Sequence, residues 1–108
     1  MTTLSTHVLD VERGVPAGGV RIVLQRGEAT LAEVATNADG RVPQLGPDGL
    51  EPGTYRLVFD VAAYFAAQGR VAPFLQRVSI DFDIHPDSRH YHVPLLLSPY
   101  ACTSYRGS

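Results

Sequence analysis

The stretch VSIDFDI, residues 78–84, decides the fold class of this chain. Apolar residues occupy its even-numbered positions, whereas serine and aspartate occupy the odd-numbered ones. Because side chains on a strand point alternately to opposite faces, this pattern places all the apolar groups on one side. The stretch therefore predicts a β-strand with one buried face and one solvated face, as in a sheet that covers a hydrophobic core.

Similar runs of strand-forming residues recur at short and regular intervals along the chain. Clusters rich in glycine, proline and aspartate separate them, and the longest cluster, residues 45–53, predicts an irregular loop. The runs at 20–25 and 29–36 lie at hairpin spacing and are expected to pair. Further strands are expected at residues 6–11, 54–59, 90–98 and 100–105. Together they predict an all-β chain, folded as a β-sandwich of seven or eight strands.

One short α-helix is expected to interrupt the strands. Asp60 is a good N-cap residue, because its carboxylate can accept hydrogen bonds from the first free N–H groups of a helix. Residues 61–68 include four alanines, and Gly69 can adopt the left-handed conformation that ends a helix. The sequence therefore predicts a helix of about two turns.

Length, charge and cysteine content narrow the class of protein. The 108 residues suit a single domain, residues 1–108, and the formal net charge of −2 predicts neither a nucleic-acid partner nor a membrane partner. The start of the chain lacks a basic segment followed by an apolar one, so a cytoplasmic protein is expected. Cys102, the one cysteine, excludes an internal disulfide and is interpreted as a small buried or interface residue.

Two histidines form the first candidate site. On a strand, His90 and His92 point to the same face and lie next to each other in space. Such a pair is compatible with a metal site, with acid–base catalysis, or with two solvated side chains on an exposed face. Because no third ligand stands at a spacing that demands a metal, all three interpretations stay open at this point.

Other candidates are weak when each is taken alone. His7 lies in the first expected strand, and Arg41 follows a tight turn. Tyr105 to Ser108 form a compact Tyr-Arg-Gly-Ser ending, although chain ends usually fray. A serine hydroxyl such as that of Ser108 is a poor nucleophile without a positioned base.

In combination, these motifs resemble a known family, the 5-hydroxyisourate hydrolases or transthyretin-related proteins. The resemblance covers nearly the whole chain and rests on segments in the family's order. Its most specific parts are residues 90–98 and 105–108, which separate the hydrolases from the hormone-carrying transthyretins. The segments are His7 to Asp10, Gly14 to Ala17, Thr36 to Arg41, Tyr64-Phe65, His90 to Ser98 and Tyr105 to Ser108.

The resemblance implies a transthyretin-like two-sheet β-sandwich with one short α-helix. It implies hydrolysis of 5-hydroxyisourate to 2-oxo-4-hydroxy-4-carboxy-5-ureidoimidazoline in urate breakdown, without a metal or an organic cofactor. It also implies a homotetramer, a dimer of dimers, with active sites in the channel between dimers. The implied catalytic residues are His7, Arg41, His92 and Ser108, and the implied substrate-binding residues are His7, Arg41, His90, Tyr105, Arg106, Gly107 and Ser108.

Three other functions remain open from the sequence. A transthyretin-like binding protein would hold a small hydrophobic ligand in the same channel, although the histidines and the Tyr-Arg-Gly-Ser ending make that lining polar. A zinc-dependent hydrolase would use His7, His90 and His92 as metal ligands. A small interaction module would have no chemical activity at all. The chain also departs from the family pattern at Cys102-Thr103-Ser104 and at Phe74-Leu75-Gln76, where no proposed catalytic residue lies.

Overall fold

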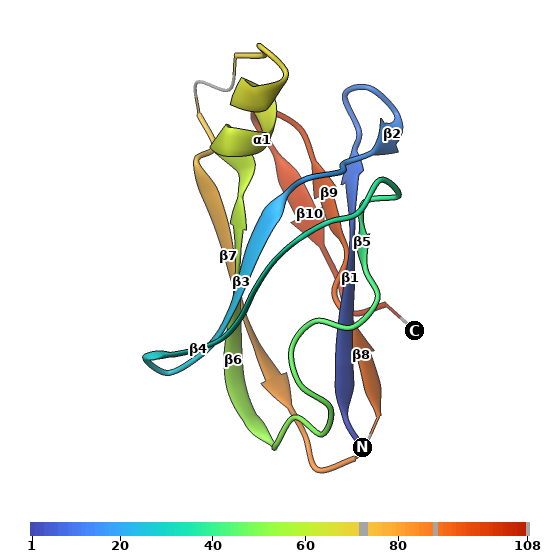
Figure 1. The fold of residues 1–108 in the computed structure, drawn as a ribbon, viewed down its shortest axis with the longest axis vertical. Coiled ribbons are helices and arrows are strands. Elements are labelled where there is room, and N and C mark those ends of the chain that lie inside the picture. The colour runs from blue at the N-terminus through green and yellow to red at the C-terminus, as the bar shows by residue number, and fades with distance from the viewer. Residues whose placement is uncertain (72–73, 88, 108) are drawn as a thin grey trace.

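The chain folds into two β-sheets packed face to face, with one short helix at the end of the sandwich (Figure 1). The computed structural model describes residues 1–71, 74–87 and 89–107. Its elements in chain order are β1 (Thr3–Asp10), β2 (Val15–Pro16), β3 (Arg21–Arg26), β4 (Ala29–Ala35), β5 (Arg41–Val42), β6 (Gly53–Asp60), α1 (Val61–Ala67), β7 (Arg77–Ile84), β8 (His90–His92), β9 (Leu95–Leu97) and β10 (Cys102–Ser104).

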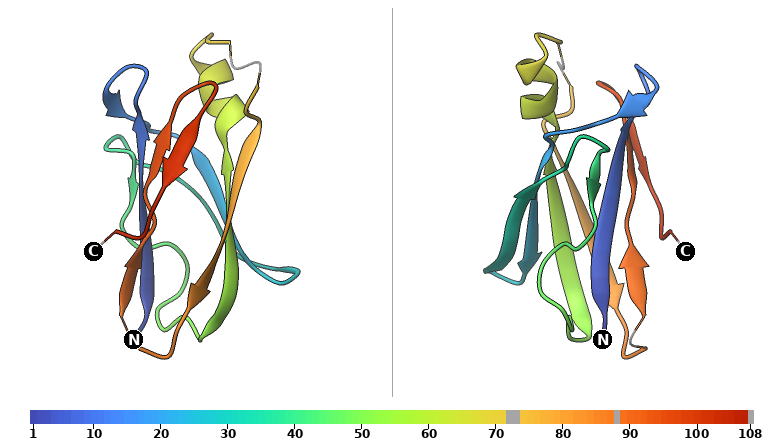
Figure 2. Two further views of the ribbon diagram at one scale, coloured as in Figure 1. Left: turned by 180° about the vertical axis from the view of Figure 1, so that it is seen from behind. Right: turned by 45° about the vertical axis from the view of Figure 1, so that its right-hand side comes forward.

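The two sheets differ in how they are built. One is a four-stranded antiparallel sheet in the order β4-β3-β6-β7, and it contains the predicted hairpin of β3 and β4. The other is organised around β1, which pairs with β8 and β9 in parallel and with β2 and β5 in antiparallel orientation. β10 pairs with β9 at the edge of this second sheet. The views in Figure 2 show the two layers from the back and at an angle. The predicted two-sheet sandwich with one short helix is confirmed.

The expected strand over residues 90–98 is wrong as a continuous element. It breaks into β8 and β9 at Val93 and Pro94, because proline has no N–H to donate to a sheet ladder. The hydroxyl of Thr6 donates to the carbonyl of Val93 at 2.6 Å, and the hydroxyl of Ser104 donates to that of Pro94 at 2.8 Å. The register with β1 is the same on both sides of the break, so the interruption does not shift either strand.

Other boundaries move by a few residues. β1 begins at Thr3, three residues before the expected start, whereas β10 is shorter than the expected strand over residues 100–105. The two-residue strands β2 and β5 were not expected, because a pair of residues carries no periodic signal. Cys102 on β10 is exposed in this chain, so it is not a buried residue, and its interpretation as an interface residue stays a prediction.

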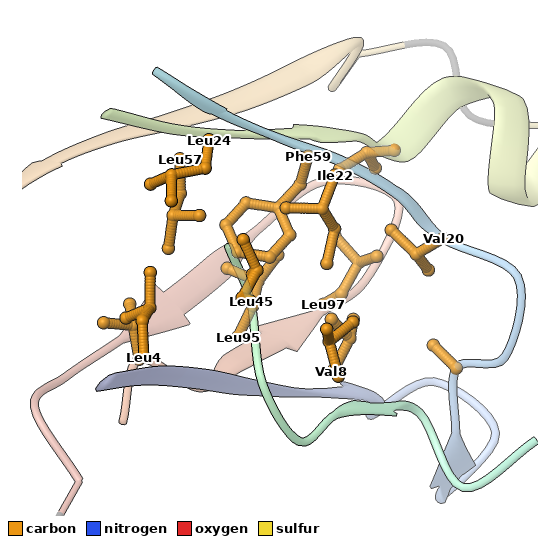
Figure 3. Packing of buried hydrophobic residues seen from close by; sticks show 14 of the residues in the cluster. Leu4, Val8, Val20, Ile22, Leu24, Leu45, Leu57, Phe59, Leu95 and Leu97 are labelled. Carbon is orange, nitrogen blue, oxygen red and sulfur yellow. The ribbon is translucent and has the colours of Figure 1, made fainter. Parts of the chain in front are cut away.

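The hydrophobic core fills the space between the two sheets (Figure 3). Leu4 of β1 points toward Leu57 of β6, and Val8 of β1 points toward Ile22 of β3 across this space. All four side chains are almost completely shielded from water. Since alternate residues of β1 enter the core, Thr3, Ser5 and His7 are left on the opposite, outer face of the same strand.

The helix is capped as predicted and is attached to the second sheet by a buried carboxylate. The Asp60 side chain accepts a hydrogen bond from the N–H of Ala63, and Gly69 has a φ of 65°. The fully buried carboxylate of Asp10, at the end of β1, accepts hydrogen bonds from the Tyr64 hydroxyl at 2.8 Å and from the Arg70 guanidinium at 2.5 Å. These contacts fix α1 against the end of the neighbouring sheet.

Among the described residues, no helix has the length and apolar character that a membrane crossing would require. The cytoplasmic location stays a prediction.

Candidate functional site

The candidate site lies on the outer face of β1, where β8 runs beside it. The parallel register places His90 opposite Thr3 and His92 opposite Ser5. Because both strands alternate, the two histidines share one face with Thr3, Ser5 and His7, as the sequence predicted for the histidine pair. Tyr91, between the histidines, points the other way and is buried.

A serine hydroxyl joins the two histidines. Ser5 Oγ lies 2.8 Å from His90 Nε2 and 2.7 Å from His92 Nδ1. The other nitrogen of His90, Nδ1, lies 2.6 Å from the hydroxyl oxygen of Thr3. The four side chains therefore form one continuous hydrogen-bonded row, which ends at His92.

Arg41 reaches this face because of a tight turn that needs glycine. Gly40 has a φ of 72°, and a Cβ atom there would lie 2.4 Å from the carbonyl oxygen of Val8. The Asn37 side chain accepts from the N–H of Arg41 at 3.0 Å, and the Gly40 carbonyl accepts from the N–H of Val8 at 2.7 Å. The turn thus delivers Arg41 onto β5, directly opposite His7 in the register with β1.

His7 is oriented by a backbone carbonyl. Its Nε2 lies 2.9 Å from the carbonyl oxygen of Asp39, in the same turn that positions Arg41. A carbonyl can only accept, so Nε2 must carry the hydrogen. When His7 is neutral, its Nδ1 is therefore the nitrogen with a free lone pair.

His92 is the half-buried imidazole of the group. Burial, followed by the positive charge of Arg41 and the neighbouring His90 and His7, lowers the pKa of His92 below its ordinary value of 6.5. A lowered pKa keeps the ring neutral, and hence able to accept a proton, over a wider range of pH. Among the described residues, Nε2 of His92 has no hydrogen-bond partner and is the atom available for chemistry.

Arg41, His90 and His92 border a shallow hollow of about 350 Å³, and His7 lies beside it, opposite Arg41. Its lining residues are Ser5, Thr6, Arg41, Pro43, His90 and His92. At this cavity the uncharged ring nitrogen of His92 can accept a proton, and the guanidinium of Arg41 can stabilise a developing negative charge.

The C-terminal tail contacts this site through Gly107. The Gly107 N–H donates to the carbonyl of His92 at 2.7 Å. A Cβ atom on Gly107 would lie 2.6 Å from Cδ2 of the His92 ring, which leaves no room for a side chain. The close approach of the tail backbone therefore positions the imidazole, and the tail is held rather than frayed at this residue.

The remaining tail residues lie elsewhere. Arg106 stacks on the Tyr91 ring, with its guanidinium carbon 4.1 Å from the ring centre, and Tyr105 is 57% exposed. Both line a second hollow, which is bordered by β7, β8 and β10, on the inner side of β8. Within this one chain the structure therefore does not bring Tyr105 and Arg106 to His92 and Arg41. Ser108 lies outside the described residues.

The metal alternative finds no support in the geometry. In residues 1–71, 74–87 and 89–107, no three His, Cys, Asp or Glu side chains come together closely enough to hold an ion. His90 and His92 direct ring nitrogens at the Ser5 hydroxyl instead, and His7 binds a backbone carbonyl.

Sequence reasoning missed two members of the site, Thr3 and Ser5. Their signal was present, because Thr3, Ser5 and His7 alternate at the spacing of one strand face. It went unused because the first strand was expected to begin at Thr6.

Comparison with known proteins identifies the family of the chain. The family model described as HIUase/Transthyretin family matches residues 4–107. This chain belongs to the HIUase/Transthyretin family. A 5-hydroxyisourate hydrolase of Caulobacter vibrioides is 45% identical over an alignment of 115 positions, which covers 100% of both chains. Solved structures of the family also superpose closely on this chain.

Two solved members illustrate the breadth of the family. The structure of Klebsiella pneumoniae 5-hydroxyisourate hydrolase superposes with a TM-score of 0.92 at 44% identity, covering 100% of both chains. Sea bream transthyretin in complex with thyroxine superposes with a TM-score of 0.88 at 33% identity, covering 97% of this chain and 94% of that one. The family fold thus includes a hydrolase and a hormone-binding protein.

Proposed function

We propose that this protein is a 5-hydroxyisourate hydrolase that forms 2-oxo-4-hydroxy-4-carboxy-5-ureidoimidazoline in urate breakdown. The observation that carries the proposal is the grouping of His7, Arg41 and His92 on one open face, in a chain that is 44–45% identical to proteins of that name. Identity to the thyroxine-binding relative is lower, at 33%, and the polar lining of the hollow suits a polar substrate better than a hormone.

The reaction adds water to a cyclic amide carbonyl and opens the ring. It needs a base that takes a proton from the water, a positive group for the oxyanion, and an acid that returns a proton to the leaving nitrogen. In our proposal His92 Nε2 accepts the proton of the attacking water, since its lowered pKa keeps it neutral. His7 orients the water, and Arg41 binds the substrate oxygen on which negative charge develops. The mechanism uses protein groups alone.

We further propose that the sites are completed in a homotetramer, a dimer of dimers. The hollow is shallow and Arg41 is exposed in the single chain, so neighbouring chains would be needed to exclude water from the reaction. In that assembly we assign the remaining substrate contacts to His90 and to the tail, Tyr105 to Ser108. Light scattering in solution tests the assembly, and a mass of one or two chains would contradict it.

The activity is tested by generating 5-hydroxyisourate from urate in the cuvette and following the decay of its absorbance. We expect the decay to accelerate in proportion to the concentration of the protein and to be unchanged by a chelator. Decay at the spontaneous rate would remove the proposed function, whereas loss of activity with a chelator would revive the zinc alternative.

Gly107→Ala is expected to damage catalysis while sparing the fold. The added methyl group would meet the His92 ring at 2.6 Å, so the imidazole must turn or the tail must detach. A misplaced base costs about a hundredfold in rate, even when the displacement is only about 1 Å. The measurement is kcat for ring opening, with thermal unfolding as the check on folding. Gly14→Ala is the control for the activity measurement, because a Cβ atom at Gly14 meets nothing within 4 Å and the position lies outside the candidate site. Its positive φ makes the alanine strained, so this variant should change thermal unfolding rather than kcat. Equal activity of the two variants would contradict the role of Gly107.

A further inference from the structure

The hydrogen bonds in the row Thr3–His90–Ser5–His92 depend on one another, because the direction of each bond fixes the direction of the next. A hydroxyl carries one hydrogen, so Ser5 can donate to only one of the two ring nitrogens that face it and must accept from the other. Each neutral imidazole likewise carries one hydrogen on its two nitrogens. The whole row therefore has only two consistent arrangements when both rings are neutral.

In the first arrangement, His92 Nδ1–H donates to Ser5, and the Ser5 hydroxyl donates to His90 Nε2. His90 Nδ1–H then donates to the hydroxyl of Thr3. This leaves the lone pair of His92 on Nε2, at the hollow, as a base requires. In the second arrangement every hydrogen bond is reversed, and His92 Nε2 carries a hydrogen and acts as a donor.

We infer that Ser5 relays to His90 the positive charge that His92 acquires when it takes a proton from the attacking water. The inference rests on the proposed function. When Nε2 of His92 gains its proton, the Nδ1–H proton passes to Ser5 Oγ while the Ser5 proton passes to His90 Nε2. One N–H bond and one O–H bond break, and one O–H and one N–H bond form. His92 ends neutral with its hydrogen on Nε2, and His90 ends as the cation.

The surroundings favour charge on His90 over charge on His92. His90 is exposed, whereas His92 is half-buried and faces Arg41 from β5 and His7 from β1. Burial and like charge both disfavour an imidazolium, and they lower the pKa of His92. Return of the proton reverses the relay: His92 Nε2–H gives its proton to the leaving nitrogen, while the His90 Nε2–H proton passes to Ser5 Oγ and the Ser5 proton passes to His92 Nδ1. Both rings are then neutral again, as at the start. Ser5 is in this scheme a relay residue and does not itself react with substrate.

The relay is tested by removing and restoring the hydroxyl. We expect Ser5→Ala to lower kcat by about tenfold to a hundredfold, the usual effect of a lost hydrogen bond to a charged group, with a smaller change in KM. Ser5→Thr keeps the hydroxyl and should recover most of the lost kcat. Ser79→Ala, on the exposed face of β7 in the other sheet, is the matched control and should behave like the wild type. Unchanged kcat in a folded Ser5→Ala protein would overturn the relay.

A second readout does not depend on activity. Nitrogen NMR of the histidine rings distinguishes N–H from bare nitrogens and shows which ring is charged. In the substrate-free wild type, we expect neutral His92 to carry its hydrogen on Nδ1, and the first proton taken up by the pair to reside on His90. Ser5→Ala should abolish the preference of neutral His92 for the Nδ1 hydrogen, whereas burial and Arg41 should still disfavour charge on His92. A first proton found on His92 in the wild type would overturn the relay whether or not any variant folds.

The two readouts separate the inference from the proposed function. If the wild-type protein does not open 5-hydroxyisourate, the proposed function fails, and the catalytic relay built on it fails with it, even if NMR shows the expected coupling. If the protein is active but Ser5→Ala changes neither kcat nor the hydrogen positions on the two histidine rings, only the relay fails.

Discussion

Replacing His92 by alanine is expected to lower kcat for the opening of 5-hydroxyisourate by about a hundredfold to ten thousandfold, the usual contribution of a positioned general base. His92 presents Nε2 at the hollow, is neutral because of its lowered pKa, and is the end of the hydrogen-bonded row from Thr3. Removing the ring leaves Arg41 without a base beside it. The measurement is the decay of freshly generated substrate under saturating conditions.

The control for this variant is His85→Gln. His85 is exposed and borders the second hollow rather than the candidate site, so its replacement should leave kcat unchanged. The pH profile of the wild type gives an independent check. A first proton taken up by the pair of His90 and His92 removes the lone pair from His92 Nε2 whichever ring carries the charge, so kcat/KM should fall in one acid limb. An active His92→Ala protein, or a wild-type profile without an acid limb, would contradict the assignment of His92 as the base.

Asp10→Ala is expected to lower the free energy of unfolding by about 3 to 5 kcal/mol, as is typical when one partner of a buried ion pair is removed. The Asp10 carboxylate accepts from the Tyr64 hydroxyl, from Arg70 and from the backbone N–H groups of Glu12 and Arg13. Without the carboxylate, a buried hydroxyl and two N–H groups lose their partner. Denaturant unfolding measures the change.

A matched surface pair provides the control. Asp81 and Arg56 form an ion pair at 2.6 Å, but both side chains are more than half exposed, so Asp81→Ala should change stability little. A loss as large in Asp81→Ala as in Asp10→Ala would mean that burial of the Asp10 network is not the cause.

The hydrogen bonds of Asp10 also predict how the free energy of unfolding depends on pH. Burial raises the pKa of Asp10, but the hydrogen bonds from Arg70, Tyr64 and Arg13 outweigh it, and the pKa lies below its ordinary value of 3.8. The unfolded chain therefore binds this proton more readily than the folded one. The contribution of Asp10 is fully present above about pH 3.8 and is lost as the pH falls through the lower pKa of the folded state. In Asp10→Ala, this part of the acid dependence should be missing.

The strands could be predicted where their signal is local. Strand β7 follows from the alternation in residues 78–84, and the capped helix follows from Asp60 and Gly69. Strand β5 could not be predicted, because it exists only where the turn at Gly40 brings Arg41 against His7. The break at Pro94 was readable from proline chemistry, yet the strong apolar pattern on either side concealed it.

The candidate site was predictable only in part. His7, Arg41 and His92 were named from the family resemblance, and the structure brings them to one face. Ser5 was overlooked because an isolated serine carries no chemical signal until its neighbours are known. Tyr105 and Arg106 were expected at the same site, but Arg106 stacks on Tyr91 on the inner side of β8.

The all-β class, the short helix and the shared direction of His90 and His92 follow from the amino-acid sequence alone. These properties depend on the alternation of apolar and polar residues and on helix capping, which act over a few neighbouring residues. Tertiary packing, in contrast, sets β8 parallel to β1 in the register that puts Ser5 between His90 and His92. Pairing of strands more than 80 residues apart depends on how the two sheets share one core, and no local pattern encodes it.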